Sequence, residues 1–262
     1  MIDQLPGLTV GLLCLTGFVA GWIDAVVGGG GVIQLPGLLI GLPASTPVAT
    51  ISGTNKLSSV AGTAMAAGTY VAKVKIAWPI TLGVIVTAFA GSSLGAHLVQ
   101  YLPRTAFWPI MVIVVGAVGV YTWRRPALGL TTALKHHGAT LWALALGLGL
   151  VVGLWDGMVG PGTGVFLVIG FVGLLGYGFL EATAMTKLTN LATNLAALIV
   201  LGSAGHILWQ LGAVMAGANF AGGAIGARMT LRHGNGFIRR VFLVAVTAVE
   251  VKLIYDTVRL FV

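Results

Sequence analysis

Apolar segments about as long as a membrane crossing recur along the whole chain. A helix needs roughly 20 apolar residues to cross a bilayer, and runs near that length follow one another from the first residues to the last. Only 8% of the 262 residues are charged, whereas a soluble domain carries about 25%. The sequence therefore predicts an all-α polytopic membrane protein, whose short loops leave no room for a separate soluble domain.

Four blocks of sequence occur twice, at an offset of 131 or 132 residues. A constant offset over several blocks indicates an internal duplication. The chain then divides into a first transmembrane repeat (1–123), a basic cytoplasmic linker (124–138) and a second transmembrane repeat (139–262). The matching blocks are 21–30 with 153–162, 55–59 with 186–190, Trp78 with Trp209, and 90–96 with 221–227.

Both repeats show the same order of segments, in which a run of glycine interrupts an apolar helix. We expect about 8–10 transmembrane segments, the number depending on whether the short piece after each glycine break crosses the bilayer. The first repeat reads as 8–27, a break at 28–31, then 32–42, 45–70, 76–99 and 105–123. The second reads as 139–158, a break at 160–164, then 165–178, 180–203, 207–229 and 237–258.

The basic residues distinguish two topologies. If the short pieces dip in and return, the Lys and Arg of the loops divide five against five. If the pieces cross, Arg104 lies alone and nine basic residues lie on the opposite side. The positive-inside rule favours the second arrangement, in which an odd number of crossings makes the halves inverted repeats. The nine are Lys73, Lys75, Arg124, Arg125, Lys135, Arg228, Arg232, Arg239 and Arg240.

Lys56 and Lys187 occupy equivalent places in long apolar segments. A lysine near the bilayer centre costs at least about 2.5–3.5 kcal/mol, so such residues usually face a cavity. A stripe of hydroxyl and amide groups surrounds each lysine, which suits a small anion. The alternative is that each lysine reaches the headgroups or pairs with an internal Asp. The candidate substrate contacts beside the lysines are Thr54, Asn55, Ser59, Thr186 and Asn190.

The glycine breaks are the second candidate feature. Broken helices leave backbone N–H groups and helix N-termini free to bind anions, which makes Gly29, Gly30, Gly31, Gly162 and Thr163 candidate contacts. The alternative is a tight turn or close packing, for which glycine is chosen on steric grounds.

Asp24 and Asp156 lie four residues before the two breaks. Three roles are open to such a carboxylate: a proton-coupling site, a structural partner for a lysine, or a cap for the N–H groups after the break. Burial would raise its pKa and a nearby lysine would lower it, so the sequence leaves its protonation state open.

Other kinds of site are not indicated. The histidines lack metal-ligand spacing, and the chain has neither a G-x-x-x-x-G-K-[ST] phosphate loop nor a nucleophile–base pattern. We therefore expect no metal, no cofactor and no enzyme activity. The net charge of +8 reflects basic loops rather than nucleic-acid binding. The expected partners are a small anionic substrate and the lipid bilayer, with a homodimer as a further possibility.

The sequence G-x-I-D-A-x-x-G-G-G-G-x-I-x-x-P-x-L-L at 21–39, followed by Gly-Leu-Pro at 41–43 and Gly-Thr-Asn-Lys at 53–56, resembles the TauE/SafE family of sulfite and organosulfonate transporters. The resemblance covers essentially the whole chain. It implies a multi-pass protein that moves small sulfur-containing anions across the bacterial inner membrane. The second repeat departs from the pattern at Pro161, Thr163 and Thr186, so the resemblance does not imply equal substrate contact by both repeats.

The leading hypothesis is a secondary transporter, driven by an ion gradient, whose two halves rock about an anion held by Lys56 and Lys187. The alternative is a passive channel for small anions. A channel would share the lysines and the repeats, but it needs a continuous wetted path.

Overall fold

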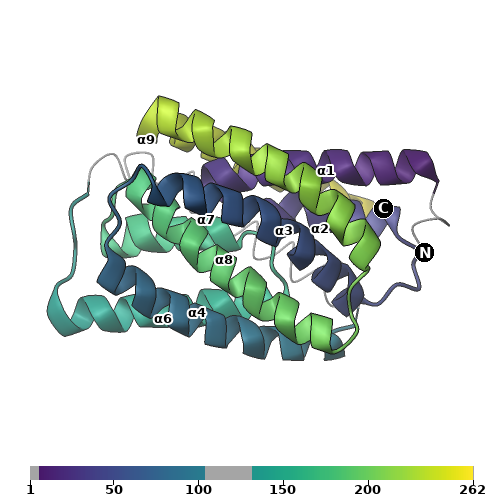
Figure 1. The fold of residues 1–262 in the computed structure, drawn as a ribbon, viewed down its shortest axis with the longest axis horizontal. Helices are drawn as coiled ribbons and strands as arrows, with labels where there is room; N and C mark the ends of the chain where they lie inside the picture. Colours follow the sequence, from purple (N-terminus) through teal and green to yellow (C-terminus); the bar gives the residue numbers. More distant parts are fainter. Residues whose placement is uncertain (1–5, 104–131, 262) are drawn as a thin grey trace.

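A computed structural model describes residues 6–103 and 132–261, and over these ranges the chain is built of helices without a strand (Figure 1). Four described helices are long and apolar enough to cross a membrane: Gly7–Val26, Trp78–Tyr101, Gly138–Met158 and Phe179–Ser203. The predicted all-α polytopic class is thereby confirmed. The predicted span 105–123, the first part of the linker, and Arg104, Arg124 and Arg125 lie outside the described residues.

The helices follow the predicted order in both halves. The first half contains α1 (Gly7–Val27), α2 (Gly31–Gly41), α3 (Val48–Val71) and α4 (Trp78–Leu98), which ends in the turn η2 (Val99–Tyr101). The second contains α6 (Gly138–Met158), α7 (Thr163–Ile169) with the π-helical η3 (Gly170–Leu175), α8 (Phe179–Ser203) and α9 (Trp209–Phe261). A kink at Gly234, with φ 66° and ψ −161°, divides α9 between the predicted segments 207–229 and 237–258.

Each glycine break is the tip of a helical hairpin. The short helix α2 folds back along α1, so that Gly37 lies against the Thr16 side chain and Gly41 against Leu13. In the second half α7 and η3 fold back along α6 in the same way, with Gly170 against Leu148. The 11 residues of α2 extend about 16 Å and bring the chain back beside Leu13 of α1.

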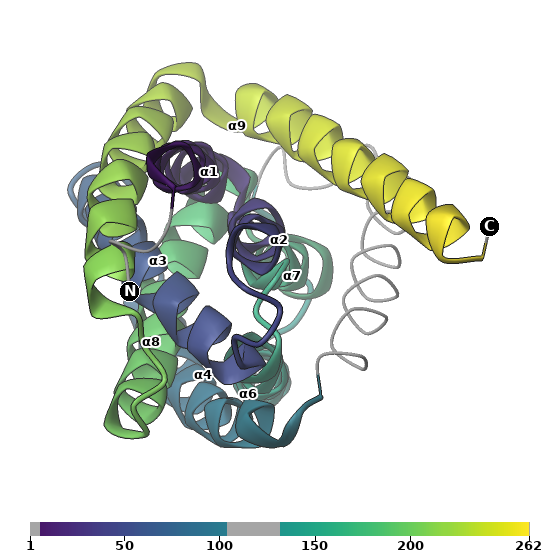
Figure 2. The ribbon, with the colours of Figure 1, turned by 90° about the vertical axis from the view of Figure 1, so that its right-hand side faces the viewer.

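The two halves pack against each other through two helix pairs. In the first pair α1 lies along α9, and in the second α4 lies along α6 (Figure 2). Glycines form both contacts. A Cβ on Gly222 would come within 2.0 Å of the Phe18 carbonyl oxygen, and one on Gly157 within 2.0 Å of the Ser92 carbonyl oxygen. Small residues let helix backbones approach this closely, which explains the glycine-rich blocks at 90–96 and 221–227.

Equivalent helices of the two halves run in opposite directions. The contacts between α1 and α9 advance together, from Gly17 with Met215 to Trp22 with Gly226, so these helices are parallel. By the same criterion α3 is parallel to α9, and α4 to α6. Since α4 runs antiparallel to α3, α1 and α6 point in opposite directions (Figure 1). This is the internal geometry an inverted repeat needs, while the placement of the halves across a bilayer remains a prediction.

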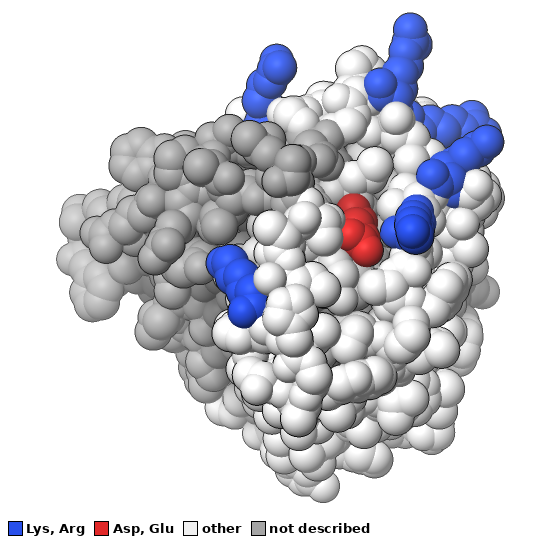
Figure 3. All heavy atoms as spheres, turned by 90° about the vertical axis from the view of Figure 1, so that its left-hand side faces the viewer, with Lys and Arg blue, Asp and Glu red and all other residues white. Residues whose placement is uncertain are grey.

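Exposed basic side chains gather at the end of the molecule where α3 finishes and α4 and α6 begin. Figure 3 shows this end, with Lys and Arg surrounding a single acidic patch. Six of the nine basic residues expected on one side have described side chains, and all six are exposed: Lys73, Lys75, Lys135, Arg228, Arg232 and Arg240.

Candidate functional site

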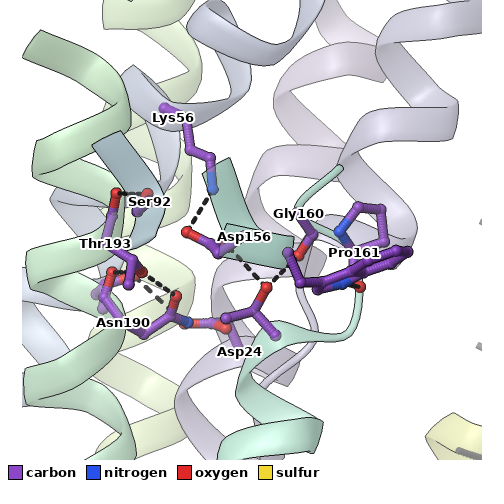
Figure 4. Close-up of polar contacts among 11 residues, drawn as sticks. Asp24, Lys56, Ser92, Asp156, Gly160, Pro161, Asn190 and Thr193 are labelled. Atoms are coloured by element: carbon purple, nitrogen blue, oxygen red, sulfur yellow. Dashed lines mark hydrogen bonds and ion pairs between the residues drawn. The ribbon is translucent and has the colours of Figure 1, made fainter. Parts of the chain in front are cut away.

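The lysine of each half forms an ion pair with the aspartate of the other half. Lys56 Nζ lies 2.6 Å from Asp156 Oδ2, and both side chains are 3% exposed (Figure 4). Lys187 Nζ lies 3.0 Å from Asp24 Oδ2 and also donates to the Asp24 main-chain oxygen. The internal Lys–Asp pairing that the sequence left open is therefore present twice, and both pairs cross between the repeats.

The two hairpin tips cross in direct backbone contact. A Cβ on Gly164 would lie 2.4 Å from the Gly28 Cα, and one on Gly28 would lie 2.5 Å from the Gly164 Cα. Gly28 also has a φ of 76°, which side chains disfavour. Close packing is thus one reason for the glycines, and it brings the segments that follow both aspartates to one place.

Asp156 is held by short hydrogen bonds. Its Oδ1 lies 2.7 Å from Thr163 Oγ1, which is also 2.7 Å from the Gly160 carbonyl oxygen. Nearby, Trp155 Nε1 donates to the Pro161 carbonyl oxygen at 2.9 Å and fixes the shape of this tip (Figure 4). Together with Lys56, Thr163 gives both oxygens of the Asp156 carboxylate a close polar partner.

Asp24 has longer contacts. The Gly29 N–H donates to its Oδ1 at 3.2 Å, and Thr63 Oγ1 lies 3.4 Å from its Oδ2. The Asp24 side chain is 14% exposed, whereas Lys187 is fully buried beneath it. The two ion pairs are therefore equivalent in sequence position but unequal in environment.

A polar cavity lies between the hairpin tips and helices α3, α8 and α9. Its free volume of about 20 Å³ is close to the minimum that holds a single water. Charged groups and neutral donors share the lining, so an anion placed here would meet both kinds of partner. The lining residues are Asp24, Gly29, Gly30, Gly31, Asn55, Lys56, Ser59, Thr63, Asp156, Gly160, Thr163, Gly164, Asn190, Asn194 and Asn219.

The structure brings most of the sequence-predicted contacts into this lining, but not all of them. Thr54, Thr186, Lys187 and Gly162 lie outside it. Thr54 Oγ1 instead donates to the Thr50 carbonyl oxygen at 2.7 Å and accepts from the Leu208 N–H at 3.0 Å. The predicted residues inside the lining are Asn55, Lys56, Ser59, Asn190, Gly29, Gly30, Gly31 and Thr163, together with both aspartates.

Asn219 is the main lining residue that the sequence reasoning missed. Its Nδ2 donates to the Gly17 carbonyl oxygen at 3.0 Å and to Gln34 Oε1 at 2.9 Å, so it ties α9 to both helices of the first hairpin. An amide inside an apolar segment was the available signal. The repeat comparison hid it, because the equivalent position of the first half is Ala88. Thr63, Asn194, Gly160 and Gly164 were also not named as contacts.

The cavity lining carries groups that can bind an anion. Within 6–103 and 132–261, no three His, Cys, Asp or Glu residues come together to hold a metal ion. The cavity supplies the Lys56 ammonium group, carboxamide N–H groups and hydroxyls, all of which donate to anions.

Comparison with known proteins places the chain among membrane transporters. The sequence model of the family described as Sulfite exporter TauE/SafE matches residues 13–253. A probable membrane transporter protein of a Sinorhizobium species is 34% identical over 245 residues, covering 93% of this chain and 92% of the relative. One from Haemophilus influenzae is 32% identical over 245 residues, covering 94% of each. One from Escherichia coli K12 is 32% identical over 250 residues, covering 95% and 91%. The resemblance found in the sequence is thereby confirmed, and the chain belongs to the TauE/SafE family.

Proposed function

We propose that this chain is a secondary transporter that moves a small sulfur-containing anion, such as sulfite or an organosulfonate, across the bacterial inner membrane under an ion gradient. The observation that carries the proposal is the charged polar cavity at the crossing of two hairpin tips, inside an otherwise apolar helical body. The family description and the names of the relatives support it.

The cavity has the donors that a sulfonate or sulfite head would need. Removing such a head from water is costly unless protein donors replace the lost hydrogen bonds. Lys56, Asn55, Ser59 and Asn190, whose side chains carry an ammonium group, two amides and a hydroxyl, all line the same small cavity. These groups come from α3 of one repeat and α8 of the other, so one anion would bridge the two halves.

Transport would require the cavity to change shape. About 20 Å³ of free volume is close to the minimum for a single water, so an anion would enter only as the lining helices separate. Inverted repeats supply such a motion, because one half can rock against the other about a fixed site. Opening toward each side in turn would give alternating access.

Apolar packing on both sides of the cavity favours a transporter over a passive channel. Along α3 the lining residues Asn55 to Thr63 lie between Val48 at one end and Tyr70 at the other, both buried. Val48 belongs to an apolar cluster with Val99 and Leu201, and Tyr70 to the largest cluster. A channel needs a continuous wetted path, which these clusters interrupt.

A thermal-shift screen of the purified full-length protein tests the proposal. We expect sulfite and simple sulfonates to raise the melting temperature, because a ligand at 100 times its Kd stabilises the folded state by about 2.7 kcal/mol. Sulfate, acetate and chloride serve as comparison anions. Lys56→Gln should abolish the shift, whereas the exposed Lys73→Gln should retain it.

Flux measurements in liposomes separate the two candidate functions. A transporter gives flux that saturates with anion concentration and follows an ion gradient, and a channel gives a current that grows with voltage. Absence of both a sulfur-anion shift and sulfur-anion exchange in the wild type contradicts the proposed substrate class.

A further inference from the structure

The charges of the site sum to zero when both aspartates are ionised. Lys56 and Lys187 are matched by Asp156 and Asp24, and all four groups are buried or nearly buried. A monovalent anion entering this region would leave one uncompensated negative charge, and an unpaired buried charge is costly. One proton taken up together with the anion restores neutrality.

Resting on the function proposed above, we infer that transport is electroneutral: one proton moves in the same direction as each monovalent anion, and Asp24 carries that proton. The anion lies beside Lys56, and the carboxyl group of Asp24 changes its protonation state at each passage. Asp156 stays ionised as the partner of Lys56.

Geometry selects Asp24 over Asp156 as the proton carrier. The Asp24 side chain is 14% exposed and Asp156 3%, so only Asp24 retains appreciable access to water. Its lysine contact is 3.0 Å against 2.6 Å, and its threonine contact 3.4 Å against 2.7 Å. The lysine and threonine therefore lie farther from the Asp24 carboxylate than from the Asp156 carboxylate.

Lys187 contributes a fixed positive charge rather than a substrate contact. Its Nζ donates both to the Asp24 carboxylate and to the Asp24 main-chain oxygen. When the carboxylate takes a proton, Lys187 keeps the main-chain acceptor, and its positive charge becomes available to balance the anion. Both lysines therefore serve the anion, although only Lys56 lines the cavity.

The other groups facing Asp24 do not compete for this role. Tyr70 on α3 donates its hydroxyl to the Ala25 carbonyl oxygen, and Asn219 on α9 is neutral. Lys56 and Asp156 lie across the cavity, paired with each other. Among the lining residues of the described structure there is no histidine. In the proton step, a hydronium ion on the entry side gives its proton to the Asp24 carboxylate and leaves as water. On the exit side the new O–H bond breaks and the proton passes to a water molecule.

Reconstituted full-length protein tests the coupling directly. Labelled methanesulfonate, a monovalent sulfonate, is offered to liposomes while K⁺ and valinomycin set the voltage. We expect an inward proton gradient to drive accumulation at zero voltage, with acidification of the lumen reported by an internal dye. Voltage alone, at equal pH, should cause no net uptake. Uptake driven by voltage, or accumulation insensitive to the proton gradient, overturns the inference.

Single substitutions test whether Asp24 is the residue that carries the proton. Asp24→Asn should lose proton-driven accumulation while retaining exchange of labelled for unlabelled methanesulfonate, because the neutral amide mimics the protonated state. Glu181→Gln, at an acidic residue outside the cavity, should retain both. Proton-driven accumulation in Asp24→Asn overturns the assignment to Asp24. If Asp24→Asn fails to fold, the wild-type voltage and proton measurements still decide the electroneutral coupling.

Wild-type exchange distinguishes failure of this inference from failure of the proposed function. Exchange that is present but uncoupled to protons contradicts the coupling alone. Exchange that is absent for both sulfite and methanesulfonate contradicts the proposed function and the coupling with it.

Discussion

Lys56 Nζ and Asp156 Oδ2 lie 2.6 Å apart, although the residues are 100 positions apart and belong to different halves of the chain. The reciprocal pair, Lys187 with Asp24, spans 163 positions. Neither half contains a buried pair of its own among these four residues. Each half therefore depends on the other to neutralise its buried charge, which couples the stability of the two halves.

Replacing one partner of a buried ion pair should lower the unfolding free energy more than replacing both partners. Asp156→Asn leaves Lys56 buried without its counter-ion, and we expect a loss of about 3–5 kcal/mol in unfolding free energy. Lys56→Met combined with Asp156→Leu should cost much less, because both buried charges disappear. Unfolding of the single and the double variant in detergent micelles measures the difference between their unfolding free energies. The exposed Lys73→Met is the control, and a single variant as stable as this control would contradict the prediction.

The contact between the hairpin tips should tolerate no side chain. Gly164→Ala would place a Cβ 2.4 Å from the Gly28 Cα, so the tips must separate and we expect both folded yield and melting temperature to fall. Gly147→Ala is the matched control, because it lies on an exposed face of α6 with no heavy atom within 4 Å of the new Cβ. Equal melting temperatures for the two variants would show that the tips do not pack as described.

Asn219 should stabilise the fold through its amide rather than its size. Asn219→Leu leaves the buried Gln34 Oε1 without the hydrogen bond that it now accepts. It also removes the second hydrogen bond to the Gly17 carbonyl oxygen, which lies within helix α1. Each buried group left unsatisfied costs about 1–3 kcal/mol, so the melting temperature should drop clearly. Ser93→Ala, which removes an exposed hydroxyl on α4, serves as the control. The prediction is wrong if Asn219→Leu has the same melting temperature as the wild type.

The order of the helices could be predicted from the sequence because apolar length and glycine breaks are local signals. The predicted segment 180–203 became Phe179–Ser203, and 45–70 became Val48–Val71. The exchange of ion pairs between halves could not be predicted, because four charged residues at equivalent positions allow pairing within a half or across halves. The packing of the two hairpin tips determines that each lysine pairs with the aspartate of the other half.

Local sequence also could not predict which individual residues line the cavity. Lys56 and Lys187 have the same local sequence setting, yet one lines the cavity and the other lies beneath Asp24. That difference depends on contacts made by α1 and the first hairpin tip, far away in the sequence. Thr54 was likewise predicted to contact the substrate because it lies near Lys56 in the sequence. Its hydroxyl instead accepts a hydrogen bond from Leu208 N–H in the loop before α9.

The opposite directions of the two halves predict which loops share a side of the membrane. Thr50 Oγ1 lies 3.3 Å from His206 Nδ1, so the loop before α3 and the loop before α9 meet at the end of the molecule away from the exposed basic residues. In a Cys14→Ala background, Ser45→Cys and Ala204→Cys should react with a membrane-impermeant maleimide from the outside of intact cells. Lys73→Cys and Lys135→Cys should react only after permeabilisation, because the positive-inside rule places the basic loops in the cytoplasm. Labelling of Ser45→Cys and Ala204→Cys from different sides would exclude the inverted arrangement, whereas reversal of all four positions would exclude only the orientation.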